Sequence, residues 1–451
     1  MTPFHLTGNH APVADERTDT DLRVTGVLPP QLTGSYLRNG PNPRKPSGHW
    51  FLGDGMVHGV HLDAGRARWY RNRFVRTASF DTGAPVHRPD GSRDLANGAA
   101  NTHVVRHAGR TLALVESSLP YELTDTLDTI GPHDFAGRLR TSMTAHPKTC
   151  PDTGELHFFG CGSIVAPYLT YHRADASGEL VVTRDIEVSG STMMHDFNLT
   201  AGHVVFMDLP VVFDLDRARA GTMPYAWQES YGARLGVLRR DDPHGAVRWF
   251  EIDPCYVFHT LNAHDEGTDR IVLHVMRRTH LYKEGAPDSP ATLWRWTIDL
   301  AAETVREEQL DDRPAEFPRI DDRHAGLPAQ HGYAATEHAL LRYDLSDGAV
   351  VAHEFGAGRT PGEASFVPAD DRPGGPGWLL TYVYDAARDT SDLVVLDADD
   401  LAAEPVATVH LPCRVPFGFH GNWLTEVKSE PASEPKSALA SEPEPVSVTD
   451  G

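Results

Sequence analysis

Short strand-like segments separated by turn residues recur along almost the whole chain, and this pattern constrains its fold more than any other feature. Gly 39 and Pro 34 among 451 residues supply the turns. Many short strands with few helices predict an all-β fold, a class that includes sandwiches, barrels and propellers. Strands are predicted at Thr111–Val115, Leu156–Gly160, His203–Asp208, Arg270–Met276, Leu293–Ile298, Glu303–Gln309, Ala339–Tyr343, Trp378–Tyr384 and Asp392–Leu396.

Two local patterns refine this prediction. The last two of these strands are joined by the polar segment 385–391, which predicts a hairpin. Helical periodicity is best from Asp216 to Arg234, but Gly221 and Pro224 interrupt it, so we expect an irregular helix there.

Composition is typical of a globular, soluble chain and argues against several partners. Hydrophobic residues make up 40% and charged residues 23%. The formal net charge of −22 argues against binding to nucleic acid. Residues 1–25 hold no apolar run, and no apolar stretch is long enough to span a bilayer, so we predict no signal peptide and a cytoplasmic location. The four cysteines are scattered without a CxxC pair, which predicts free thiols rather than disulfides.

Four histidines stand out because each lies among small or apolar residues, whereas most of the 25 histidines have no such setting. Neutral imidazole is the commonest protein ligand for a transition metal, and a buried imidazole is costly unless it is bonded or ligated. The four lie too far apart in the chain to share a helical turn, so only tertiary folding can bring them together. They are His146, His195, His259 and His420, in the blocks 144–148, 193–197, 257–262 and 418–421.

A propeller explains how residues so distant in sequence could meet. Inner strands of different blades all reach the common axis, and seven blades would take about 60 residues each. We therefore favour a propeller over a barrel. The chain has no exact repeat and no WD signature, so its blades would be degenerate.

Six blocks, in order along the chain, resemble motifs of the carotenoid cleavage oxygenase family. That family includes carotenoid and apocarotenoid cleavage enzymes, the retinal pigment epithelium isomerase and bacterial lignostilbene dioxygenases. One such block is a weak signal, but six in register are a strong one, and the resemblance runs from Leu32 to about Trp423. The blocks are Arg38–Pro43, Phe51–His58, Ala145–Pro147, His195–Phe197, Phe258–Ala263 and Phe417–Gly421.

The resemblance implies a seven-bladed propeller with a small helical and loop cap over one face, and an Fe(II) ion held on the axis by the four histidines. It also implies three glutamates behind these ligands, at Glu116, Glu316 and Glu363. Ala364 follows the third, where the family usually has a proline nearby, which makes this assignment the weakest of the three. A carboxylate that accepts the imidazole proton fixes the tautomer and orientation of the ring. Zinc would also accept four nitrogens, but it has no redox change with which to activate O₂.

The implied reaction is oxidative cleavage of a carbon–carbon double bond with O₂, giving two carbonyl products. In lignostilbene-type members a lysine precedes the first glutamate and pairs with a phenol oxygen, whereas this chain has Val115 there. The apolar side chain predicts a carotenoid or apocarotenoid substrate and leaves stilbenes and related aryl-alkenes as the alternative. A second alternative is a non-catalytic propeller that binds partners or carries apolar ligands, which the presence of all seven site residues disfavours.

The C-terminal residues 426–451 have a different composition, in which Ser-Glu-Pro occurs three times. Such a segment cannot bury enough apolar surface to fold, so we predict one propeller domain over 1–425 and a disordered tail over 426–451. An insoluble polyene has to arrive from a membrane, a micelle or a carrier. Peripheral membrane contact is therefore expected, with exposed aromatic residues of 119–121 and 223–227 as candidates and core packing of the same residues as the alternative.

Overall fold

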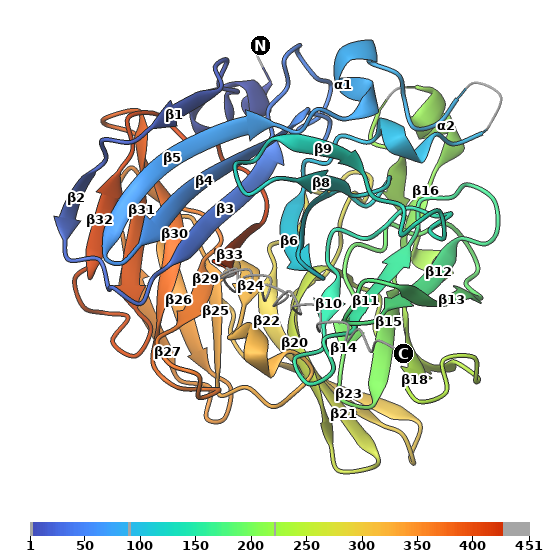
Figure 1. The fold of residues 1–451 in the computed structure, drawn as a ribbon. Helices are drawn as coiled ribbons and strands as arrows, with labels where there is room; N and C mark the ends of the chain where they lie inside the picture. Colours follow the sequence, from blue (N-terminus) through green and yellow to red (C-terminus); the bar gives the residue numbers. More distant parts are fainter. Residues whose placement is uncertain (1–2, 89–91, 221, 427–451) are drawn as a thin grey trace, which may run out of the picture.

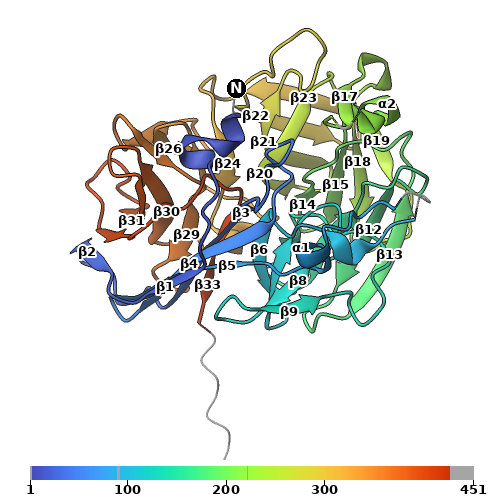
Figure 2. The same cartoon turned by 90° about the horizontal axis from the view of Figure 1, so that it is seen from above.

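Seven sheets of antiparallel strands, arranged around a common axis, make up the computed structural model (Figures 1 and 2). The structure describes residues 3–88, 92–220 and 222–426. The predicted seven-bladed all-β propeller is thus confirmed. The Ser-Glu-Pro-rich tail predicted at 426–451 lies, except for Glu426, outside the described residues.

The first four blades follow one another along the chain. In each blade the strands lie side by side from the axis to the outer edge. Blade one has β33 (Gly421–Thr425) innermost, then β3 (Gly34–Pro41), β4 (Gly55–Asp63), β5 (Arg66–Phe74) and β1 (Arg17–Asp19). Blade two has β6 (His103–His107), β7 (Arg110–Leu114), β8 (Tyr121–Leu123) and β9 (Thr129–Pro132). Blade three has β10 (Lys148–Thr149), β11 (Leu156–Gly160), β12 (Leu169–Ala174) and β13 (Leu180–Ile186). Blade four has β14 (Asn198–Leu199), β15 (His203–Asp208), β18 (Arg234–Arg239) and β19 (Arg248–Glu251).

The other three blades complete the ring. Blade five has β20 (Tyr256–Glu266), β21 (Arg270–Arg278), β22 (Thr292–Asp299) and β23 (Thr304–Gln309). Blade six has β24 (Glu316–Arg319), β25 (His331–Ala335), β26 (Ala339–Asp344) and β27 (Val350–Glu354). In blade seven, β28 (Arg359–Pro361) and β29 (Ser365–Pro368) both pair with β30 (Gly377–Asp385), followed by β31 (Thr390–Asp397), β32 (Ala407–His410) and β2 (Arg23–Gly26).

The two ends of the chain close the ring together. The last strand, β33, pairs with β3 in blade one, and the N-terminal β2 pairs with β32 in blade seven. Each of these two blades therefore combines strands from both ends of the sequence. This closure holds the first and last blades side by side.

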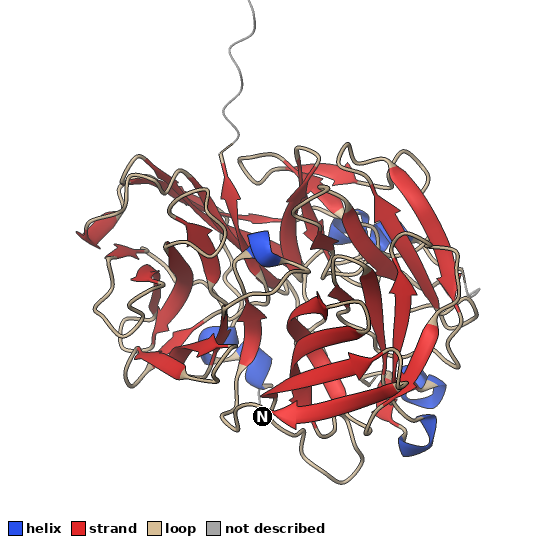
Figure 3. Ribbon diagram, turned by 90° about the horizontal axis from the view of Figure 1, so that it is seen from below, coloured by secondary structure: helices blue, strands red, loops and turns tan. Residues whose placement is uncertain are grey.

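The helical segments of the described chain are few and short (Figures 1 and 3). Figure 1 shows α1 (Ala78–Thr82) and α2 (Leu215–Arg219) at the top of the molecule and β16 (Val211–Phe213) at the right, below α2. β16 forms a two-stranded ribbon with β17 (Tyr225–Trp227). Figure 3 shows how small the helical content is beside the strands. The 3-10 turns are Phe4–Leu6, Gly8–His10, Leu95–Asn97, Glu229–Tyr231 and Asp322–His324.

The core lies between neighbouring blades, where alternate strand residues of one sheet pack on the next. Between blades four and five, for example, Leu235, Leu273 and Trp296 are fully buried in one cluster. Burying a side chain of this size contributes about 1.5–3 kcal/mol, so each blade interface is a substantial source of stability. The period of two in strands is what places these side chains on the packed face.

Most predicted strands are confirmed, and the predicted helix is wrong. β11 and β15 have the predicted bounds, and the hairpin of β30 and β31 is present. The helix predicted over Asp216–Arg234 is present only as the five-residue α2, because the chain then turns back and β17 pairs with β16. All four cysteines are free thiols, as predicted.

Candidate metal centre

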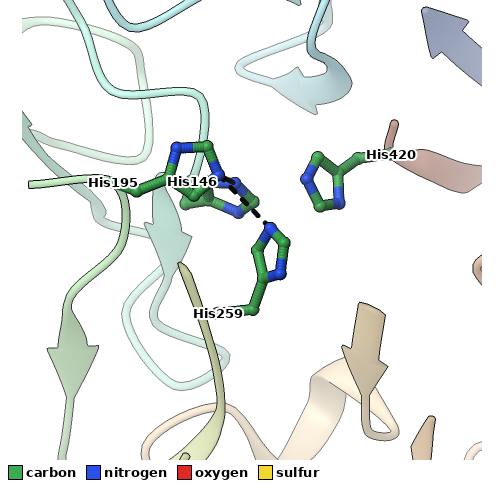
Figure 4. A group of neighbouring side chains, drawn as sticks. All are labelled: His146, His195, His259 and His420. Carbon is green, nitrogen blue, oxygen red and sulfur yellow. Dashed lines mark hydrogen bonds between the residues drawn. The ribbon is translucent and has the colours of Figure 1, made fainter. Parts of the chain in front are cut away.

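The four histidines singled out from the sequence meet on the propeller axis (Figure 4). His259 lies in β20, and the other three lie one to three residues before the innermost strands β10, β14 and β33. One ring nitrogen from each falls within a group whose members all lie within 4.8 Å of one another. The Nε2 atom of His195 is 2.9 Å from that of His146 and 3.3 Å from that of His259.

This donor set fits a single transition-metal ion. Metal–nitrogen bonds of about 2.1 Å set at right angles place neighbouring nitrogens about 3 Å apart, close to the observed spacings. Burial, together with the neighbouring imidazoles, holds the pKa values of His146 and His420 well below the ordinary value. Both rings are therefore neutral near pH 7, which is the form that binds a metal.

Three glutamates orient three of these rings through the opposite ring nitrogen. His195 Nδ1 donates to Glu116 through a short contact. His259 Nδ1 donates to Glu316 at 2.6 Å, and the Nδ1 of the fourth ring, His420, donates to Glu363 at 2.9 Å. With the proton on Nδ1, the Nε2 lone pair of each ring points at the shared centre.

The carboxylates of Glu116 and Glu316 stay ionised because their histidine partners outweigh the effect of burial. Burial alone would raise the pKa of Glu116 and of Glu316, but attraction to and hydrogen bonding with His195 and His259 hold both pKa values below the ordinary one. Burial would likewise lower the pKa of His195, but the Glu116 carboxylate raises it. The proton on Nδ1 is thus stabilised by a fixed negative charge.

Every blade contributes one of the seven residues. The histidines come from blades one, three, four and five. Glu116 follows β7 in blade two, Glu316 opens β24 in blade six, and Glu363 lies between β28 and β29 in blade seven. The sevenfold ring therefore brings together residues that no local segment could gather.

Glu363 has the most extensive contacts of the three glutamates. Besides the His420 ring, its carboxylate accepts the backbone N–H of Gly421 at 2.7 Å and contacts Arg319 at 3.3 Å. Its backbone carbonyl accepts the hydroxyl of Tyr36 at 2.9 Å. The alanine at 364, where a proline was expected, does not prevent these contacts.

Irregularities in the inner strands aim consecutive side chains at the same centre. The pairing of β20 with β21 shifts register between Val257 and Thr260, on either side of His259. The pairing of β24 shifts directly after Glu316, and the next residue, Phe317, has a φ of 55°. Bulges of this kind re-aim side chains next to functional sites.

An aromatic chamber of about 250 Å³ lies against His195, His259 and His420. Val115, placed in the cavity by the sequence, is on its wall. Six aromatic side chains dominate the lining. They are Trp50, Phe51, Phe258, Phe317, Phe417 and Phe419.

A second and more polar cavity, of about 620 Å³, reaches the histidines from another side. Lys148 and Arg319 are among its charged lining residues, together with Asp196, which is paired with Lys148 at 2.8 Å. The four histidines therefore stand between an apolar and a polar compartment.

Sequence reasoning missed several residues of this region. Phe258 and Phe419 each directly precede one of the four histidines, so those motifs carried a signal for the chamber wall. Phe317 directly follows Glu316 and carried the same kind of signal, whereas Arg278 had none. His103 had none either, although its ring lies 5.3 Å from that of His420, between centroids.

The proposed membrane-contacting aromatics are corrected in part. Tyr121 is only 2% exposed and belongs to a core cluster, so the expectation that it is exposed is wrong. Tyr225 and Trp227 are half-buried and pack against the core between blades four and five. None of the described helices is long and apolar enough to cross a membrane.

The fold and this site define a propeller metalloprotein, with the metal site on the axis. The family model described as retinal pigment epithelial membrane protein matches residues 10–425. The chain is 42% identical to a carotenoid cleavage oxygenase of Mycobacterium tuberculosis, covering 93% of this chain and 97% of that one. It is 33% identical to carotenoid 9,10(9',10')-cleavage dioxygenase 1 of Arabidopsis thaliana, covering 94% and 90%. It therefore belongs to the carotenoid cleavage oxygenase family, and the carotenoid cleavage dioxygenases that it matches are oxidoreductases.

Solved structures agree with this assignment. The lignostilbene dioxygenase of Pseudomonas brassicacearum superposes with a TM-score of 0.86 at 29% identity, covering 94% of this chain and 98% of that one. A cobalt-substituted Synechocystis ACO superposes with a TM-score of 0.82 at 26% identity, covering 92% and 97%.

Proposed function

We propose that this protein is a non-haem Fe(II) dioxygenase that cleaves a carbon–carbon double bond of a carotenoid or apocarotenoid with O₂ to give two carbonyl products. The observation that carries this proposal is the convergence of four imidazole nitrogens beside an aromatic chamber. When bound, Fe(II) would supply the redox chemistry that activates O₂, which zinc in the same site would lack.

In this proposal His146, His195, His259 and His420 are the metal ligands. Four neutral ligands leave the ion its full positive charge. The three glutamates are hydrogen-bonded to ligand histidines and balance that charge from behind them. Glu116, Glu316 and Glu363 hold the ring protons on Nδ1 and so fix the direction of the Nε2 lone pairs. Loss of one of these acceptors is expected to weaken metal binding rather than to remove a reacting group.

The chamber positions the alkene and excludes water. Aromatic faces such as those of Phe258 and Phe419 offer an apolar, rigid surface for a conjugated chain. Holding the double bond beside the metal converts a bimolecular reaction into an effectively unimolecular one, which lowers the entropic part of the barrier. This side of the centre needs no general base, and the described glutamates on it are already engaged by histidines.

The chamber continues outward, which suits a substrate longer than its own volume. A cavity of about 440 Å³ shares Arg278, Glu316, Phe317 and Phe417 with it. A polyene could occupy both spaces, and the apolar Val115 on the inner wall supports such a substrate. A stilbene-type aryl-alkene is the second candidate, because the inner chamber alone has the size for a short substrate and the lignostilbene dioxygenase has the same fold.

We further propose that residues 1–425 act as one propeller domain in the cytoplasm and that substrate arrives by peripheral contact with a membrane. No nucleic acid is expected as a partner, given the net charge of −22.

A substrate panel tests the activity. Iron-loaded protein is incubated in air with carotenoids, apocarotenals and stilbenes, and the carbonyl products are identified by mass spectrometry. We expect paired aldehydes or ketones from one substrate class. If no member of the panel is cleaved, or if products form equally without iron, the proposed function is wrong.

A further inference from the structure

The four histidines lie on the axis inside the propeller, so an ion needs a route through the protein to reach them. Two cavities touch this group, and both are lined by His259 and His420. His146 lines the polar cavity, and His195 lines the aromatic chamber. The geometry therefore offers two routes, and the chemistry of their walls separates them.

The sizes of the two cavities do not decide between the routes. A divalent ion in water carries about six water molecules, and at about 30 Å³ for each water this shell needs roughly 180 Å³. The polar cavity of about 620 Å³ and the aromatic chamber of about 250 Å³ both exceed that volume. The deciding property is the polarity of the wall.

The wall of the aromatic chamber is unfavourable for a hydrated ion. Most of it consists of the six aromatic side chains named above, which cannot replace the water around an ion. Moving a charge from water into apolar surroundings is very costly. The two carboxylates in this wall, Glu116 and Glu316, are each already bound to a histidine ring.

The polar cavity offers polar groups from the protein surface inward to the histidines. Exposed residues stand at its outer end, among them Thr149, Asp322 and Thr425. Oxygen atoms of carboxylates and amides are favourable contacts for a divalent cation and for its water. The side chains of this kind further inside are Asp196, Asn198, Asn262, Glu363 and Asn422.

The basic residues of this wall do not exclude a cation, because each is paired with a carboxylate. Burial also lowers the pKa of His103, another lining residue, to about 3, so this ring is neutral near pH 7. The net charge of −22 adds a field that attracts cations. The ion pairs, at 2.6–3.1 Å, are Arg106–Asp125, Lys148–Asp196, Arg319–Asp322 and Arg323–Asp321.

We infer that the polar cavity is the route by which a hydrated divalent cation reaches the four histidines, while the aromatic chamber admits the organic substrate. The inference rests on the proposed function for the identity of the metal ligands. Separate routes mean that an alkene in the chamber does not block the passage of the ion.

Substitutions that narrow one cavity at a time test this route. Ala325→Trp adds a large side chain to the wall of the polar cavity, and Asn422→Phe enlarges a side chain whose amide oxygen lies 3.4 Å from Arg319 Nη2 in the same wall. Val115→Trp narrows the aromatic chamber instead. Ala301→Trp is the matched control, because Ala301 is exposed between β22 and β23 and is not a lining residue of either cavity.

The probe is cobalt(II), and the protein is folded and metal-free. Uptake is stopped with excess chelator at set times, and the cobalt that the protein retains is quantified. Release is followed from cobalt-loaded protein in excess chelator, and affinity is measured by competition at equilibrium. A narrower route raises the barrier in both directions, so it slows uptake and release by the same factor and leaves the affinity unchanged. A damaged centre changes the affinity instead.

We expect Ala325→Trp and Asn422→Phe to slow both uptake and release roughly 10-fold or more, the effect of a barrier higher by about 1.4 kcal/mol. Val115→Trp and Ala301→Trp should keep the wild-type rates. All four variants should bind one cobalt per chain with the affinity of the wild-type protein.

Three results would overturn the inference. Unchanged rates in both variants of the polar cavity, or slow uptake in Val115→Trp alone, would place the route elsewhere. Weaker cobalt affinity in both variants of the polar cavity would show that the substitutions act on the centre and not on its access. Folded metal-free protein that takes up no cobalt would show that the site is filled only while the chain folds. Iron-loaded protein that cleaves no substrate would refute the proposed function and would leave these rates measurable.

Discussion

Replacing Glu363 or Glu116 by glutamine should show separately how each glutamate contributes to the free energy of unfolding and to iron affinity. Glu363 has a side chain only 3% exposed and satisfies three donors: the ring of His420, the backbone of Gly421 and the guanidinium of Arg319. The Glu116 side chain is 26% exposed, and its contact within the centre is to His195. Both substitutions keep the size of the side chain, and both remove its charge.

The contacts give different expected costs for the two variants. A glutamine at 363 presents one oxygen and one NH₂ group, so at least one of the three donors then faces another donor. A buried unsatisfied donor costs about 1–3 kcal/mol, and breaking a buried charge pair costs about 3–5 kcal/mol. Arg319 keeps its bond to the Gly421 carbonyl at 2.8 Å, so we expect about 3 kcal/mol for Glu363→Gln. Glu116→Gln should cost about 1 kcal/mol, because its amide oxygen can still accept from His195.

The free energy of unfolding is measured in urea on metal-free protein, and iron affinity is measured separately by competition with a chelator. Iron affinity should fall about 10- to 100-fold in both variants, because both lose the charged acceptor behind a ligand. Equal destabilisation by the two substitutions would refute the reasoning from contacts. Unchanged iron affinity in Glu363→Gln would show that this glutamate does not support the centre.

Three further outcomes follow from the structure and the sequence. Burial lowers the pKa values of His58, His157, His172 and His274 to about 3, 2, 4 and 3, so the folded protein binds fewer protons than the unfolded chain below pH 6.5. The free energy of unfolding of metal-free protein, measured in urea, should therefore fall on acidification below pH 6.5, by roughly 1 kcal/mol per histidine per pH unit, and a rise would contradict this. Truncation after Val427 should leave the melting temperature and turnover unchanged, since the Ser-Glu-Pro composition cannot pack, and a large drop in melting temperature would show that the tail docks. Liposome binding should be weak and nearly insensitive to salt, because a net charge of −22 opposes attraction to anionic lipid, whereas binding that requires anionic lipid and disappears with salt would refute it.

Strand positions could be read from the sequence because alternation and turn residues are local signals. Leu156–Gly160 is a strand with the bounds expected from its own residues. The helix predicted over Asp216–Arg234 does not continue beyond α2, because Tyr225–Trp227 pairs with β16 instead. The contact of Tyr225 with Phe213 across β16 and β17 is not visible in a local pattern. Tertiary pairing decided that segment.

The site could be predicted only in part from the sequence, for a similar reason. The blocks around the four histidines name the residues that meet, but the distances between them depend on the closure of seven blades. The resemblance located Glu363 by its motif, while its bond to Arg319 comes from packing between blades. Arg278 carried no signal because nothing in its neighbours in the sequence shows that it lines the aromatic chamber.

The iron content of His259→Ala tests the central claim most directly. The matched control is His264→Ala in the same strand, where the ring stacks on His274 away from the four-histidine group. Wild-type protein and the control should bind one iron per chain and produce two carbonyl products for each O₂ consumed. His259→Ala should keep its β-rich circular dichroism spectrum but lose most of its iron and its cleavage activity. Stoichiometric iron in His259→Ala would contradict the four-histidine centre.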